Sequence, residues 1–103
     1  MGGLMITIVN NKYYNLLVKR LDGDRKEKLF RLMQRLSEIF GGKITAEVIR
    51  GRDNVAYLLL VIKCSNVSYQ EASYLLEKSR ELLVQVDPGK ELDFVCFAVG
   101  FES

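Results

Sequence analysis

Residues 44–64 consist of two β-like runs separated by a polar turn: ITAEVIR (44–50), GRDN (51–54) and VAYLLLVIKC (55–64). In the first run, Ile44, Ala46 and Val48 fall on one face of an extended strand and the intervening residues fall on the other. The second run is almost continuously apolar, and the GRDN segment has the composition of a tight turn. Together the three segments predict a β-hairpin in the middle of the chain.

A helix is predicted on each side of this hairpin. Residues 24–27, DRKE, have the spacing of a capping box, and the apolar residues that follow predict a helix from about Arg25 to Phe40. Gly41 and Gly42 are expected to stop it. Residues 68–71, SYQE, form a second capping box before a helix that ends at residues 87–89, DPG. Its core-facing stripe is Ala72, Leu75, Leu76, Ser79, Leu82, Leu83 and Val86.

Both ends of the chain are predicted to be β. Phe94–Phe101 forms the last strand, while Met5–Val9 and Tyr13–Arg20 are β-rich runs joined by an Asn-Asn turn. Residues 1–12 are therefore expected to be either an arm or a hairpin strand. The resulting order is βαββαβ with an extra N-terminal β segment, which is an α+β, ferredoxin-like or RRM-like arrangement. It predicts an antiparallel sheet with two helices on one face, in one domain spanning residues 1–103.

The composition is that of a globular chain, with 49% hydrophobic and 27% charged residues. No apolar run approaches the roughly 18 residues of a membrane span, and no basic segment precedes an apolar one at the N-terminus. Cys64 and Cys96 lie in apolar β-like runs, as buried free thiols do in a reducing compartment. We therefore expect a cytoplasmic protein without membrane contact, in which both thiols react slowly.

The residue inventory argues against an enzyme. The chain contains no histidine, so it lacks the usual general base and the commonest metal ligand, and neither cysteine has a histidine to activate it. The Asp22-Gly23-Asp24 segment resembles a fragment of a cation loop but lacks the remaining ligands, and helix capping explains it better. We expect no catalytic residue, no cofactor and no metal site.

Basic residues concentrate in the first part of the chain. Residues 1–63 carry 12 Lys/Arg and 6 Asp/Glu, whereas residues 64–103 carry 3 and 7. Lys28, Arg31 and Arg35 form a stripe on the outer side of the first predicted helix, and such a row could neutralise the closely spaced phosphates of a duplex or a structured RNA. The alternative is an ordinary solvated helix face. The candidate nucleic-acid-binding residues are Lys26, Lys28, Arg31, Arg35, Lys43, Arg50 and Arg52.

The predicted sheet is apolar on both faces, although an antiparallel sheet with one wet face normally carries polar residues there. The second face is expected to be covered by the N-terminal segment, by another protein or a second copy, or by stacked RNA bases. Its uniformly aliphatic character favours protein. The candidate interface residues are Tyr57, Leu59, Val61, Val95, Phe97, Val99 and Phe101.

The element order resembles that of the small RRM-like protein subunits of archaeal and eukaryotic ribonuclease P. The resemblance rests on four segments: KYYNLLV (12–18) as an opening strand, IFG (39–41) as a helix end, LVIKCS (60–65) and FAVG (97–100). It implies a protein that assists a catalytic RNA in maturing the 5′ ends of tRNA. It also implies pairing with another protein through the sheet side.

Two functions follow as hypotheses. The first is a non-catalytic RNA-binding accessory subunit of a ribonucleoprotein that uses its basic first helix and the hairpin turn. The second is a ferredoxin-like interaction or regulatory module that dimerises through its apolar sheet face and binds no nucleic acid.

Overall fold

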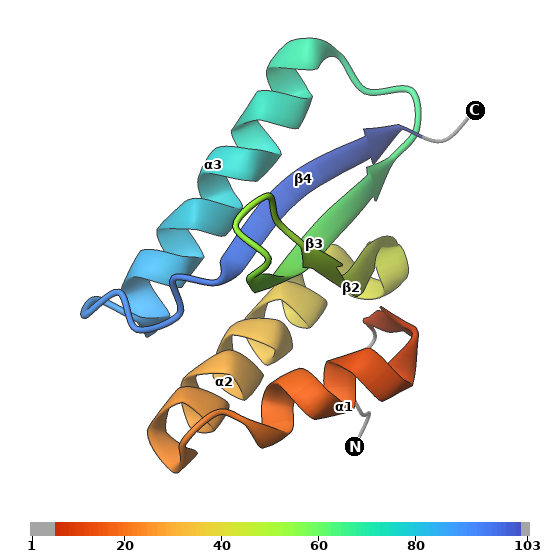
Figure 1. Cartoon of the computed structure of the whole chain (residues 1–103). Helices are drawn as coiled ribbons and strands as arrows, with labels where there is room; N and C mark the ends of the chain where they lie inside the picture. Colours follow the sequence, from red (N-terminus) through yellow and green to blue (C-terminus); the bar gives the residue numbers. More distant parts are fainter. Residues whose placement is uncertain (1–5, 102–103) are drawn as a thin grey trace.

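The computed structural model describes residues 6–101, which form an α+β fold with a four-stranded mixed sheet and three α-helices (Figure 1). The elements in chain order are β1 (Thr7–Val9), α1 (Asn11–Lys19), α2 (Gly23–Phe40), the short 3-10 helix η1 (Gly41–Lys43), β2 (Ile44–Arg50), β3 (Ala56–Cys64), α3 (Tyr69–Val86) and β4 (Val95–Phe101).

The central hairpin forms as predicted. β2 and β3 pair antiparallel over seven residue pairs, from Ile44 opposite Ile62 to Arg50 opposite Ala56. The alternation in β2 places Ile44 and Ala46 in the core, both fully buried, and exposes Glu47. The hairpin is the only antiparallel pairing in the described sheet.

The prediction of an antiparallel, ferredoxin-like sheet is wrong, although the predicted α+β class is confirmed. The strands lie in the order β1-β2-β3-β4, and the two outer pairs, β1 with β2 and β3 with β4, run parallel. Each parallel pair requires a helical crossover: α1 and α2 connect the first pair, and α3 connects the second. The sheet is therefore mixed rather than antiparallel.

Side-chain caps set the starts of both long helices. Ser68 accepts a hydrogen bond from the Glu71 amide at 3.1 Å, which confirms the predicted cap of α3. In α2 the cap lies two residues earlier than predicted, because Asp22 rather than Asp24 accepts from the Arg25 amide, at 2.8 Å. Gly41, with φ of 61°, ends α2 in the left-handed region that glycine tolerates.

The predicted strand over residues 13–20 is wrong, because α1 occupies Asn11–Lys19. Tyr14, Leu17, Val18 and Leu21 recur at helical spacing, and all four pack in or against the core. The Tyr14 hydroxyl donates to the sulfur of Met33 on α2 at 3.2 Å. Within the N-terminal arm or hairpin that we expected over residues 1–12, Thr7–Val9 form the edge strand β1, and residues 1–5 lie outside the described part.

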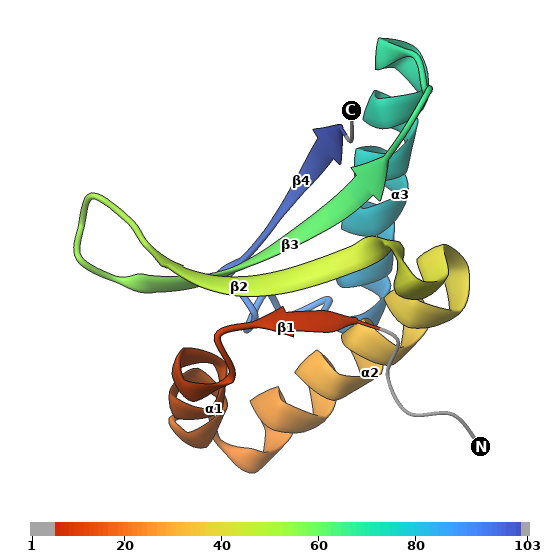
Figure 2. The ribbon, with the colours of Figure 1, turned by 90° about the vertical axis from the view of Figure 1, so that its right-hand side faces the viewer.

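One side of the sheet carries the core. Buried residues of β2 and β3 pack against Leu29, Leu32, Met33 and Leu36 of α2 and against the inner side of α3. Figure 2 shows the long helices on this side of the twisted sheet, with no helix among residues 6–101 on the opposite side. The prediction of two helices on one face is confirmed for α2 and α3.

None of the helices within residues 6–101 is both long enough and apolar enough to cross a bilayer.

Candidate nucleic-acid interface

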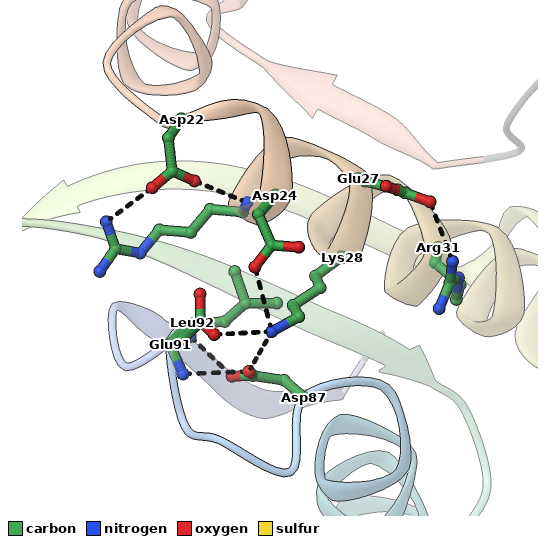
Figure 3. Close-up of polar contacts among 9 residues, drawn as sticks. Asp22, Asp24, Glu27, Lys28, Arg31, Asp87, Glu91 and Leu92 are labelled. Carbon is green, nitrogen blue, oxygen red and sulfur yellow. Dashed lines mark hydrogen bonds and ion pairs between the residues drawn. The ribbon is translucent and has the colours of Figure 1, made fainter.

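Lys28, the first residue of the predicted basic stripe on α2, is engaged within the protein (Figure 3). Its ammonium group lies 2.8 Å from a carboxylate oxygen of Glu91, 3.4 Å from Asp24 and 3.7 Å from Asp87. The hydrogen bond to Glu91 raises the pKa of Lys28 above its ordinary value, against the opposing effect of partial desolvation. Three carboxylates thus compensate this cation, and it ties α2 to the segment between α3 and β4.

Asp87 anchors the other side of this cluster. It is buried, and its two carboxylate oxygens accept hydrogen bonds from the amides of Glu91 at 3.0 Å and Leu92 at 2.6 Å. These bonds fold the chain after α3 into a turn that directs Leu92 into the core, where it is 1% exposed. The arrangement is structural, since two backbone amides and the Lys28 ammonium group satisfy the buried Asp87 carboxylate.

The rest of the α2 set is dispersed. Arg31 forms an ion pair with Glu27 at 3.1 Å, one turn earlier on the same helix. Arg35 is exposed and makes no ion pair within residues 6–101. Lys26 is half-buried near the start of α2, and Lys43 lies beyond its far end in η1. The predicted stripe therefore offers few uncompensated cations for phosphate.

The turn between β2 and β3 presents Arg50 and Arg52, and hydrogen bonds within the turn fix its shape. Asp53 accepts hydrogen bonds from the Tyr57 hydroxyl at 2.8 Å and the Val55 amide at 3.1 Å, and these bonds lower the pKa of Asp53. A Cβ at Gly51 would approach the Tyr57 ring to 2.7 Å, so only glycine fits there without a shift. Arg50 donates to the side chain of Asn54 at 3.3 Å, and Arg52 is exposed.

A groove lies between α1 and this end of the hairpin, which we call the α1–hairpin groove. Its volume is about 480 Å³. Apolar side chains make up most of its lining, two arginines add positive charge, and no carboxylate among residues 6–101 lines it. The lining residues are Tyr13, Leu16, Leu17, Arg20, Val48, Ile49, Arg50 and Ala56.

Two residues of the groove were absent from the sequence-based candidates. Tyr13, in the first turn of α1, is 53% exposed, and Arg20 is the residue that follows the last turn of α1. Both lie in the segment predicted as a strand, so their juxtaposition with Arg50 could not be foreseen. The available signal was that residues 11–20 carry Lys12, Lys19 and Arg20 and no acidic residue.

The seven predicted interface residues do not share one face of the sheet, so that expectation is wrong. The register pairs Leu59 with Cys96 and Val61 with Ala98, which places Val95, Phe97, Val99 and Phe101 on the opposite face from Tyr57, Leu59 and Val61. Val95 belongs to the helix-side core, and Phe97 and Val99 pack against it. Phe101 is 61% exposed at the end of β4.

The helix-free face of the sheet is nonetheless mostly apolar. Leu59, Val61 and Ala98 occupy its centre and are half-buried, while Glu47 and Lys63 are the charged residues of its strands. Cys96 is partly exposed on this face, whereas Cys64 lies buried on the core side. The burial expected for both thiols therefore holds for Cys64 and only partly for Cys96.

Among residues 6–101, no group of three or more His, Cys, Asp or Glu residues is arranged to hold a metal ion.

Compared with known proteins, the chain matches no family model, no curated protein and no solved structure. Function is therefore inferred from the geometry of the molecule.

Proposed function

We propose that this protein is a non-catalytic RNA-binding accessory protein that holds RNA in the α1–hairpin groove. The observation that carries the proposal is the lining of that groove, where an exposed tyrosine and two arginines surround an apolar floor and the described part of the chain contributes no carboxylate. Single-stranded RNA is commonly bound by stacking its bases on aromatic side chains while cations contact its phosphates. The groove combines both kinds of group.

Charge around the groove supports the proposal. Lys12 and Lys19 are exposed on α1, and Arg52 is exposed on the adjoining turn. Asp53 is the acidic residue of that turn, and its carboxylate accepts hydrogen bonds from Tyr57 and Val55 that fix its position within the turn. A polyanion approaching this end of the molecule meets several cations, which favours association and releases counterions.

The site differs from the one expected from sequence. Arg50 and Arg52 are retained as contacts, Tyr13 and Arg20 are added, and the α2 stripe is assigned a secondary role because Lys28 is compensated by Glu91, Asp24 and Asp87. Kinship with the ribonuclease P subunits stays a prediction. One segment that suggested it, residues 12–18, forms a helix rather than the opening strand.

The test is a fluorescence anisotropy titration of a labelled RNA stem-loop with the wild type and with the double variant Arg20→Gln/Arg50→Gln. We expect the variant to bind about tenfold more weakly at moderate salt, with a slope of log K against log salt that is flatter by roughly one to two. Both side chains line an open groove, so thermal unfolding should change little.

The matched control is Arg31→Gln/Arg35→Gln, which removes the same charge from the predicted α2 stripe. It should leave affinity and salt slope close to those of the wild type. Absence of RNA binding by the wild type at low salt would contradict the proposal, and so would a larger loss in the α2 variant than in the groove variant.

A second candidate function is a protein-interaction module, and the helix-free sheet face favours it. Leu59, Val61 and Ala98 form an apolar strip there that no helix within residues 6–101 covers. Changing Val61 to Lys would place a charge in the middle of this strip. Loss of a bound protein partner upon that change, with RNA binding intact, would support this second function.

A further inference from the structure

β4 forms the outer edge of the described sheet and lacks the usual protections of an edge strand. It pairs with β3 over seven consecutive residues without a bulge, and its sequence, VCFAVGF, contains no charged residue and no proline. The opposite edge, β1, has only three residues. Natural edge strands are generally short, charged, bulged or interrupted by proline, because an open edge pairs readily with another strand. β1 follows this pattern and β4 does not.

The hydrogen bonds between β3 and β4 show which backbone groups of β4 point toward β3 and which point to the free edge. The Leu58 amide donates to the carbonyl of Phe94 at 3.0 Å, so residue 94 directs its backbone groups toward β3. Since these groups alternate along a strand, residues 96, 98 and 100 also face β3. The amides and carbonyls of Phe97, Val99 and Phe101 then lie along the free edge.

We propose that β4 pairs antiparallel with β4 of a second copy of the chain, across a two-fold axis at Ala98, and so joins two sheets into one. With the axis there, all seven residues overlap, and the outward-facing residues meet one another. Phe97 pairs with Val99 of the partner subunit, and Phe101 pairs with Val95 of the partner subunit. Each Phe97–Val99 pair exchanges two backbone hydrogen bonds in an antiparallel ladder. At each Phe101–Val95 pair the Val95 carbonyl accepts from the Phe101 amide, because the Val95 amide already donates to the carbonyl of Leu92 in its own chain, at 3.3 Å.

Charge favours a second copy as the occupant. Two-fold pairing places Ala98 opposite its own symmetry mate and every other β4 residue opposite another residue of the same strand, so a strand with charges of one sign would repel itself. β4 is uncharged throughout, and Ala98, which would face Ala98 of the partner subunit, is small. On the core side, pairing would also cover Phe101, which is 61% exposed in the single chain. This interface is separate from the α1–hairpin groove and does not depend on the proposed function.

The test is size-exclusion chromatography with light scattering at tens of micromolar protein, comparing wild type, Ala98→Lys and Val99→Pro. The wild type should have twice the 11.8 kDa mass of the chain. Ala98→Lys brings two ammonium groups together at the axis, and Val99→Pro removes an outward amide without removing a bond to β3. Both variants should run as monomers.

Thr45→Lys is the matched control, because Thr45 lies on the same helix-free face as Ala98 but two strands from the edge. It should remain a dimer. A monomeric wild type, or dimers in both β4 variants, would overturn the proposal. Dissociation by Thr45→Lys would overturn it as well, because that result indicates association through the face. Circular dichroism checks that each variant is folded, and the second β4 variant decides the result if the first is not.

Discussion

Within residues 6–101, three side chains have a raised pKa in the folded protein, one through burial and two through a hydrogen bond to a carboxylate. Burial raises the pKa of the Tyr14 hydroxyl, the hydrogen bond to Asp53 raises that of Tyr57, and the hydrogen bond to Glu91 raises that of Lys28. In each case the protonated form is favoured by folding. The stability that these groups contribute is therefore fully present below their unfolded pKa and is lost as pH rises through the folded pKa. The ordinary values are 10.0 for tyrosine and 10.5 for lysine.

The expected result is a fall in the urea midpoint of unfolding as pH rises above about 10. Tyr14 should account for most of it, because Tyr57 and Lys28 are more open to solvent, which screens their interactions. Tyr14→Phe should flatten the decline, whereas Tyr69→Phe, at a side chain that is 83% exposed, should not. If the urea midpoints of the two variants declined equally between about pH 8 and about pH 11.5, Tyr14 would not be the source of the decline.

Helix α1 presents two adjacent tyrosines in opposite environments. Tyr14 is 9% exposed and contacts Met33, whereas Tyr13 is 53% exposed in the groove. Tyr14→Ala should lower the free energy of unfolding by about 3 kcal/mol, because it removes a large buried ring and leaves a cavity.

Tyr13→Ala serves as the counterpart, since it removes the same ring from the exposed side of the same helix. It should leave stability within about 0.5 kcal/mol and weaken RNA binding through lost stacking. Urea unfolding and anisotropy titration measure the two effects. A large stability loss in Tyr13→Ala, or unchanged RNA affinity, would be inconsistent with the groove.

Local signals predicted several elements well. The turn at Gly51–Asn54, the cap formed by Ser68 and the glycine stop at Gly41 each act within a few residues, so the sequence nearby specifies them. The two long helices and the central hairpin followed from such signals.

Other features depend on contacts distant in sequence. Residues 13–20 are rich in residues that favour strands, but packing of Tyr14 against Met33 stabilises the helical spacing instead. Within β3 and within β4, the sequence predicts correctly which residues share a face. Which face of β4 lies beside which face of β3, however, depends on the pairing register between the two strands. Pairing of Leu59 with Cys96 rather than Phe97 reversed the face assigned to all of β4. The groove was missed because it joins α1 to the hairpin.

For the whole molecule, the structure separates two surfaces. The α1–hairpin groove lies beside β2, at one side of the sheet, and the free edge of β4 lies at the other, beyond β3. A dimer formed through β4 would leave both grooves open. Substitutions in the groove should therefore change RNA binding without changing self-association, and substitutions in β4 should do the reverse. Distant sites that share no contacts generally act independently in this way.

The most direct measurement is an NMR titration of the ¹⁵N-labelled protein with the RNA stem-loop, which reports the contacted surface residue by residue. The proposed function predicts that the largest amide shift changes fall in Tyr13–Arg20 and in Ile49–Ala56, the two segments that line the groove. Shifts concentrated around Arg31 and Arg35 on α2, or no shifts at low salt, would contradict it.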